Sequence, residues 1–395
     1  MLVYQYYTPG HDVFFDTFAM YGLASILDDL NIEFSVIPLG NRYIIEAHDV
    51  VDEDKFRSNL LKKLSDEALR RELSMLRMFN KEWDLSVKIA DKILEGRVKL
   101  PPLSVLQDPE HGLDEGRGRV RANYINVYLP LSPLYGKYYT TFSGKLPKGD
   151  RSAQMLVCSL CASLASIGYA EAAMKKRFRY EGGIELFTLT LQPTAKTSRE
   201  KLMALKTLIT LTGEINIGYG KSPPGKIIPL IVMASEVLSS IKGGGIIATP
   251  MNVLYYVMER ERRGAEPRSI GVHPFGPYLG FLREIIESGM SRENVVDIVQ
   301  RLLGRRQPEY GPLETLSDAI LHRDIMLLYE FMRELWTLRE EVNLVGKLEP
   351  GLLHAFTAYA YGRERGETIL DKVRVKVQKV LEELLSRLES EGHGS

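Results

Sequence analysis

The hydrophobic residues of this chain change their spacing after about residue 245. Before that point, runs with apolar residues three or four apart alternate with short strand-like runs. The predicted strands are residues 32–39, 42–47, 124–129, 138–142 and 184–191, and the predicted helices are residues 11–30, 52–95 (two or three helices), 152–177 and 197–211. Beyond it, only helical spacing is found, over residues 251–263, 278–288, 292–303, 313–345, 351–361 and 366–388.

This pattern predicts an α+β fold with two domains. Residues 1–268 would form a mixed α/β nucleic-acid-binding domain with basic loops, and residues 269–395 a helical bundle, because Gly and Pro cluster over residues 264–276. The length of 395 residues supports more than one domain. The hydrophobic share of 45% and the charged share of 26% are typical of a folded globular chain.

The only cysteines, Cys158 and Cys161, lie three residues apart on a predicted helix, which suits two buried thiols better than a stabilising disulfide. So few cysteines are typical of a reducing compartment, and the N-terminus shows no signal peptide. Residues 152–170 carry no charge, but several Ser and one Gly dilute their hydrophobicity. We therefore expect a cytoplasmic protein with a buried helix there and no membrane partner.

The charges are unevenly distributed although Lys plus Arg and Asp plus Glu both number 51. Residues 1–60 contain ten acidic and three basic residues, so this end would repel phosphate. Residues 115–225 contain sixteen basic and seven acidic residues. A basic middle region inside a neutral chain predicts local attraction to a polyanion.

The candidate nucleic-acid-binding residues share a positive charge, an aromatic ring or a flexible glycine backbone. They are Arg117, Arg119, Arg121, Lys137, Tyr138, Lys145, Lys148, Arg151, Lys175, Lys176, Arg177, Arg179, Lys221, Lys242, Gly243 and Gly244. The segment 135–151 interleaves cations, rings and glycines, as a loop that follows a phosphate backbone would.

Three of these groups also have simpler interpretations. The cations at 175–179 end a predicted helix, where the helix dipole alone would favour them. The glycines that follow Lys242 would let a duplex approach closely, but they could equally form a hinge. Lys221 ends a sequence that resembles a phosphate-binding loop, yet Ile215 replaces the required first glycine and prolines follow, so we exclude a nucleotide triphosphate site.

Two His-Asp pairs, at 11–12 and 48–49, are the dipeptides around which metal-dependent phosphohydrolases gather ligands, and His111 could be a further ligand. Neither pair has the two-ligands-per-helix-face spacing of a metal site, so surface histidines are favoured. Cys158 and Cys161 lack a second cysteine pair or a His-x-His partner, which argues against zinc. We expect no enzyme activity, no metal and no cofactor.

Residues 7–27, TPGHDVFFDTFAMYGLASIL after the opening Tyr7, are followed by the predicted hairpin 32–47. This beginning resembles that of the large subunit of the archaeal type I-A (Apern subtype) CRISPR interference complex. The motif covers about the first fifty residues. The rest of the chain resembles this family only in its predicted arrangement, a mixed α/β region with basic loops followed by a helical bundle. The resemblance implies a non-catalytic subunit that recognises the protospacer-adjacent motif in double-stranded target DNA and assists duplex opening, while guide RNA pairing supplies target specificity.

The implied partners are the guide RNA complex with its CRISPR backbone and small subunits, and the helicase and nuclease subunits. On this view the cations would hold phosphates, a glycine stretch would lie against the minor groove, and a long side chain would separate the first base step. Two alternatives stay open: a metal-dependent HD-type phosphohydrolase, and a scaffold subunit that binds only protein through its basic middle region.

Overall fold

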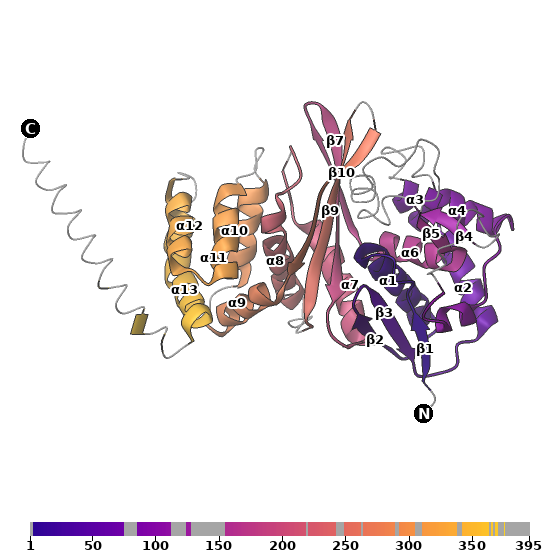
Figure 1. The fold of residues 1–395 in the computed structure, drawn as a ribbon. Helices are drawn as coiled ribbons and strands as arrows, with labels where there is room; N and C mark the ends of the chain where they lie inside the picture. The colour runs from indigo at the N-terminus through magenta and orange to yellow at the C-terminus, as the bar shows by residue number, and fades with distance from the viewer. Residues whose placement is uncertain are drawn as a thin grey trace, which may run out of the picture.

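The computed structural model describes most of the chain and confirms an α+β fold (Figure 1). The described residues are 3–74, 85–111, 124–127, 155–218, 220–241, 249–261, 264–288, 292–304, 310–337 and 342–362, with 365, 368, 369 and 375. No helix among them is long and apolar enough to cross a bilayer.

The N-terminal region combines a small antiparallel sheet with helices. Its elements are β1 (Tyr4–Tyr7), α1 (Val13–Asp29), β2 (Phe34–Leu39), β3 (Arg42–Ala47), α2 (Glu53–Ser65), α3 (Glu67–Ser74), α4 (Leu85–Leu94), the 3-10 helix η3 (Leu103–Gln107), β4 (Tyr124–Val127), β5 (Met155–Cys158) and α6 (Ser159–Glu171). Asp12 caps α1 by accepting hydrogen bonds from the backbone N–H groups of Phe14 and Phe15. The hairpin between β2 and β3 confirms the predicted turn at Gly40, whose φ is +64°.

Helices α1 and α6 cross at unusually close range through two glycines. A Cβ atom at Gly22 would lie 1.9 Å from the carbonyl oxygen of Leu164, and one at Gly168 would lie 1.8 Å from that of Phe18. The predicted buried helix is therefore confirmed as α6, whose residues from Ser159 to Tyr169 are all buried. Only residues without side chains allow the two backbones to touch here.

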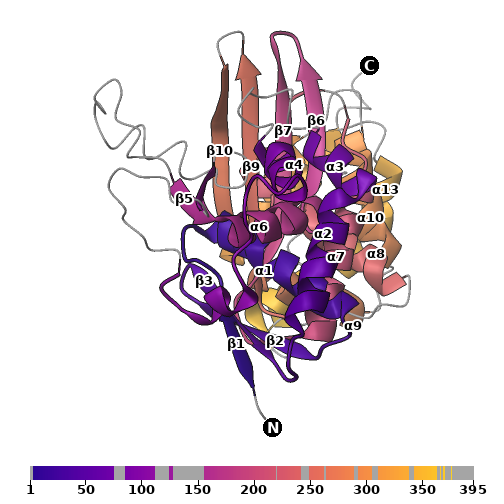
Figure 2. The same cartoon turned by 90° about the vertical axis from the view of Figure 1, so that its right-hand side faces the viewer.

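The central layer is an antiparallel sheet with the strand order β10-β9-β7-β6. Its strands are β6 (Met174–Tyr180), β7 (Gly183–Pro193), β9 (Met251–Glu261) and β10 (Gly264–Pro274). They form two antiparallel pairs, β6–β7 and β9–β10; the strand ends at Tyr180, Gly183, Glu261 and Gly264 lie at the same end of the sheet, and the strands project there beyond the helices (Figure 2). Between the hairpins in sequence lie β8 (Thr197–Ser198), which joins the edge of the first sheet, α7 (Arg199–Glu214), the 3-10 helix η5 (Gly225–Ile227) and α8 (Ile228–Ile241).

Two predicted helices are wrong where this sheet forms. Of residues 251–263, predicted as a helix, residues 251–261 form strand β9 and the last two lie outside the described residues; the glycine- and proline-containing segment 264–274 is strand β10. Because β9 lies inside the sheet and is buried on both faces, its apolar residues run without alternation, and such a run does not distinguish a strand from a helix. The predicted helix 152–177 is likewise β5, α6 and the start of β6.

The C-terminal region is helical, as predicted. Its helices are α9 (Gly276–Glu287), α10 (Arg292–Gly304), α11 (Tyr310–His322), α12 (Ile325–Thr337) and α13 (Val342–Tyr361). The predicted helix 313–345 is interrupted at Arg323, whose φ is +54°, and Asp324 accepts a hydrogen bond from the N–H of Met326 at the start of α12. Nearly all of the predicted helix 366–388 lies outside the described residues.

Buried apolar residues form one continuous cluster that runs from Tyr6 to Phe356. The sheet supplies its middle, with α7 and α8 packed between the N-terminal and C-terminal helices (Figure 1). Residue 268, the expected domain boundary, lies within β10, which pairs along its length with β9. We therefore propose that any boundary between the sheet and the helical bundle follows Pro274.

Candidate nucleic-acid interface

The structure describes five of the sixteen candidate nucleic-acid-binding residues. Eleven lie outside the described residues and remain predictions: Arg117, Arg119, Arg121, Lys137, Tyr138, Lys145, Lys148, Arg151, Lys242, Gly243 and Gly244. The other five are Lys175, Lys176, Arg177, Arg179 and Lys221. Four of these lie on strand β6 and not in a helix, and among them Lys175 bonds to carbonyl oxygens in the last turn of α6, where the helix dipole favours a cation.

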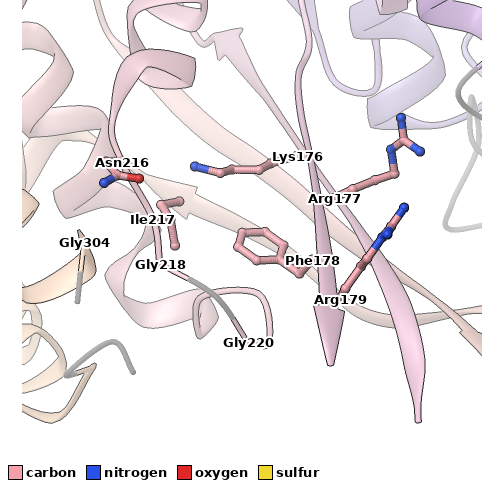
Figure 3. Close-up of a pocket in the computed structure, with 9 residues that line it drawn as sticks. All are labelled: Lys176, Arg177, Phe178, Arg179, Asn216, Ile217, Gly218, Gly220 and Gly304. Carbon is pink, nitrogen blue, oxygen red and sulfur yellow. The ribbon is translucent and has the colours of Figure 1, made fainter. Parts of the chain in front are cut away.

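The alternation of strand β6 divides its cations between the two faces of the sheet. Lys175, Arg177 and Arg179 lie on one face, and Lys176 lies on the other together with Phe178. Figure 3 shows the side chains of Lys176 and Phe178 pointing towards the loop after α7, while those of Arg177 and Arg179 point away from it. The four cations within residues 175–179 therefore do not form one continuous surface.

Lys175 is held inside the protein. Its side chain is 5% exposed, and its Nζ lies 2.9 Å from Oε2 of Glu72 on α3. Nζ also donates hydrogen bonds to the carbonyl oxygens of Tyr169 and Ala170, 3.2 and 3.0 Å away. Burial lowers the pKa of Lys175, although the charge of Glu72 opposes this effect. These contacts remove Lys175 from the residues available to a polyanion.

Arg177 and Arg179 are exposed near the projecting turn between β6 and β7. Arg179 is opposite Ile184, and Ile184 is in turn opposite Arg260 on β9, so both arginines lie on the same face two strands apart. Arg260 is also exposed. Arg260 was not among the predicted residues because its segment has the spacing of a helix. Only the strand pairing places it on the same face as Arg179.

Lys221 lies on the opposite face of the same projecting end. Its Nζ is 5.1 Å from the centre of the Tyr180 ring, a cation–π contact at the last residue of β6. We call Arg177, Arg179, Lys221 and Arg260 the basic hairpin end. The exposed Glu181 in the turn after β6 lowers the net charge of this end.

A cavity of about 570 Å³ opens beside β6 on the face of Lys176 (Figure 3). Its lining consists of Lys176, Arg177, Phe178, Arg179, Asn216, Ile217, Gly218, Gly220 and Gly304. Nζ of Lys176 donates a hydrogen bond of 3.3 Å to the carbonyl oxygen of Ile215, and burial lowers the pKa of this amine. The glycines leave backbone accessible, so the cavity could hold an anionic group against Lys176.

The sequence after Gly220 does not form a phosphate-binding loop. The backbone N–H of Ser222 donates a hydrogen bond of 2.6 Å to Oε2 of Glu185, a carboxylate with 0% exposure. Arg268 forms an ion pair with the same carboxylate. An amide that already binds a carboxylate does not serve a phosphate, which agrees with the exclusion of a nucleotide triphosphate site.

The two His-Asp pairs lie at opposite ends of β3. His11 follows Gly10, which lies against the side chain of Arg42, the first residue of β3. His48 follows Ala47, the last residue of the same strand. Six residues of strand separate them by about 20 Å. Asp12 is engaged as the cap of α1, and Asp49 is exposed. The ligand set of an HD-type phosphohydrolase is therefore not assembled by these residues.

Comparison with known proteins gives two matches that cover most of the chain. Residues 4–355 match the family model described as CRISPR-associated protein (Cas_Csa4). A protein from Thermoproteus tenax described as CRISPR system associated protein Cas8 is 26% identical over an alignment 364 residues long, which covers 79% of this chain and 96% of the relative. The two matches confirm the resemblance to the large subunit of a CRISPR complex but not its subtype, and the chain belongs to the Cas_Csa4 family of CRISPR-associated proteins.

Proposed function

We propose that this protein, as the large subunit of an archaeal type I-A CRISPR RNA-guided complex, recognises the protospacer-adjacent motif in duplex DNA and assists its opening. The observation that carries the proposal is the basic hairpin end, where exposed cations gather on two projecting hairpins. The family membership supports a role in a CRISPR effector complex. The choice of DNA as the direct partner rests on charge and shape.

Paired strands and arginines suit this task physically. The major groove of B-form DNA is wide enough to admit a two-stranded ribbon of the kind that β6 and β7 form. The guanidinium groups of Arg177 and Arg179 can each donate two parallel hydrogen bonds to one phosphate. Their spacing on one face of β6 allows them to contact phosphates of the same strand.

The cavity beside Lys176 offers a second contact during opening. A nucleotide that leaves the duplex needs a partner for its phosphate, and Lys176 is the cation that points into this cavity (Figure 3). Phe178 is 3% exposed and forms apolar lining beside it. In this arrangement the exposed arginines would hold the intact duplex, while Lys176 would bind a phosphate of the displaced strand.

The decisive experiment reverses two charges on the basic hairpin end. We expect the double variant Arg177→Glu, Arg179→Glu, assembled with guide RNA and the other subunits, to bind target duplex at least about tenfold more weakly, because two phosphate contacts become repulsive. The matched control is Lys55→Glu, Arg57→Glu, two exposed cations with the same spacing on α2. Equal affinity of the two double variants in an anisotropy titration would overturn the proposal.

The segment 145–151 provides an independent prediction that lies outside the described residues. Reversing Lys145, Lys148 and Arg151 to Glu should leave the fold intact and weaken duplex binding by the assembled complex. Circular dichroism checks the fold, and an electrophoretic titration measures the binding. Unchanged binding would show that residues 145–151 do not belong to the DNA interface, which would then consist of the basic hairpin end alone.

A scaffold that binds only protein is the competing assignment for the same basic residues. If the protein were such a scaffold, the affinity of the complex for DNA would not depend on Arg177 and Arg179. Affinity purification with the guide RNA and backbone subunits as readout, beside the DNA titration, separates the two functions. Normal assembly with weakened DNA binding is the result that we expect.

A further inference from the structure

His111, Cys158 and Cys161 come together in the N-terminal region, although fifty residues of sequence separate the histidine from the second cysteine. Within the part of the chain that the structure describes, their ligand atoms form a group in which all lie within 4.8 Å of one another. Nε2 of His111 is 3.1 Å from Sγ of Cys161. Both thiols are buried and neither forms a disulfide.

We propose that these three residues bind one zinc ion, or another thiolate-binding divalent transition metal, as a structural site. Zinc takes thiolate sulfur at about 2.3 Å and imidazole nitrogen at about 2.0 Å in a tetrahedral arrangement, so its ligand atoms lie about 3.5–3.8 Å apart. The separation of 3.1 Å between His111 and Cys161 requires only a small outward shift to admit an ion. A bound metal would replace the hydrogen bond between Nε2 of His111 and Sγ of Cys161.

The hydrogen bonds of His111 prepare its Nε2 as a ligand. The Nδ1 atom of His111 lies 2.7 Å from the carbonyl oxygen of Asp108, and because a carbonyl only accepts, Nδ1 carries the proton. In the neutral ring this leaves a lone pair on Nε2, which is the atom directed at Cys161. A histidine fixed by a backbone carbonyl through its other nitrogen is the usual arrangement of a metal ligand.

Cys158 and Cys161 bracket the first turn of α6. Cys158 is the N-cap residue of this helix, and its sulfur accepts a hydrogen bond of 3.3 Å from the backbone N–H of Cys161. The positive end of a helix dipole favours a thiolate over a thiol. The start of α6 therefore favours the thiolate form of Cys158, which is the form that binds a metal.

His11 is the candidate for a fourth ligand. Its Nε2 atom is buried and has no hydrogen-bond partner in the structure, which is unfavourable unless something else binds it. His11 does not belong to the group whose ligand atoms lie within 4.8 Å of one another, so its ring would have to move towards the other three residues to bind the same ion. With His11 the donor set would be two sulfurs and two nitrogens, the composition of many structural zinc sites.

A redox role for the Cys-Ser-Leu-Cys sequence is disfavoured by the same geometry. Dithiols that exchange disulfides are partly exposed to their partners, whereas Cys158 and Cys161 are 4% and 1% exposed. A buried group of two thiols and an imidazole suits a metal that joins segments of the chain. Here it would connect the turn after η3 to the start of α6, close to the start of α1.

The test is the metal content of the full-length protein, expressed with zinc in the medium and purified without chelator. We expect about one zinc per chain in the wild type and less than about a tenth of that in Cys161→Ser and His111→Ala. The matched control His48→Ala, which removes a histidine outside the group, should keep its zinc; it would lose zinc if the His-Asp pairs held the metal instead. Circular dichroism identifies any variant that fails to fold.

The cobalt-substituted wild type provides a readout that needs no variant. Cobalt bound by two thiolates in a tetrahedral site gives intense thiolate-to-metal charge-transfer absorption, which a carboxylate or histidine site lacks. Wild-type protein without metal and without this absorption would overturn the proposal, as would a Cys158–Cys161 disulfide in protein purified under reducing conditions. For His11→Ala we expect zinc affinity about tenfold to a hundredfold lower, and unchanged affinity would overturn its assignment as fourth ligand.

Discussion

The cations of the N-terminal region and those of the basic hairpin end carry the same charge in different surroundings. Around α1 and α6, lysines lie in ion pairs: Lys63 contacts Asp29 and Glu171, each at 2.9 Å, and Lys206 contacts the same glutamate. At the hairpin end Arg177 and Arg179 are exposed beside a projecting turn. The comparison teaches that an excess of positive residues in a sequence does not identify a binding surface until the exposure of each side chain is known.

The basic middle region of the sequence contains cations of both kinds. Lys175, Lys196, Arg199 and Lys206 belong to it, and each forms an ion pair with an acidic residue. Three of these acidic partners, Asp28, Glu33 and Glu46, come from the acidic first sixty residues. Part of the charge segregation in the sequence therefore serves the contact of β8 and α7 with the N-terminal sheet.

The largest effect on stability is expected where the N-terminal region is packed most closely. Gly22→Ala places a Cβ atom 1.9 Å from a backbone oxygen of α6, so the two helices must move apart. We expect the free energy of unfolding to fall by about 3 kcal/mol or more. The control Gly213→Ala on α7 meets its nearest atom at 3.6 Å and should change stability by less than about 1 kcal/mol. Equal stability of both variants in urea unfolding would contradict the packing of α1 on α6.

A somewhat smaller loss is expected when the ion-pair network of this region is broken. Glu171→Gln leaves Lys63 and Lys206 without their shared carboxylate, at a site where the glutamate side chain is 22% exposed. We expect a loss of about 2–3 kcal/mol in the free energy of unfolding. Glu330→Gln removes the exposed pair with Arg333 and should cost less than about 1 kcal/mol. Similar losses in the two variants would show that the buried network has no special weight.

The pKa of Glu171 predicts how the stability difference between the wild type and Glu171→Gln depends on pH. Burial alone would raise the pKa of Glu171, but the charge of Lys206 and hydrogen bonds from Lys206, Lys63 and Ser25 outweigh it and lower the pKa. A depressed pKa in the folded state contributes stability that is present above the unfolded value of 4.5 and is lost as pH falls through the folded value. The gap in melting temperature between wild type and Glu171→Gln should therefore be full at pH 7 and close in acid. A gap that stays constant down to acid unfolding would contradict this account.

The smallest stability effect is expected at the hairpin end. Arg177→Glu together with Arg179→Glu should change the free energy of unfolding by less than about 0.5 kcal/mol for each residue, because both side chains are exposed. Thermal unfolding measures this directly. A large loss would mean that these arginines stabilise the sheet, as Lys175 does, and would remove the contrast between the two regions.

Local sequence patterns predicted the first helix, the hairpin after it and the C-terminal helices, because each has a clear periodicity. They failed for β6, since the apolar run of α6 continues through Ala172 and Ala173 into the strand without a glycine or proline to end the helix. They failed for β10, because Pro267 and Pro274 argued against a strand; β10 is an edge strand, where proline is tolerated.

The candidate sites depended even more on tertiary structure. The spacing of Lys175, Lys176 and Arg177 identified a basic segment, but only the strand assignment separates the buried lysine from the exposed arginine. The sequence pattern argued against zinc because Cys158 and Cys161 have no second cysteine pair or His-x-His sequence to complete a set of ligands. The turn after η3 brings His111 to them from fifty residues away, and no local motif contains that information.

The salt dependence of duplex binding by the assembled complex tests the role of the basic hairpin end most directly. The logarithm of the association constant falls linearly with the logarithm of salt concentration, with a slope of about −0.9 per neutralised phosphate. We predict that Arg177→Gln together with Arg179→Gln makes this slope shallower by about two, while Lys55→Gln together with Arg57→Gln leaves it unchanged. Parallel lines for the wild type and both variants would show that Arg177 and Arg179 do not contact the DNA backbone.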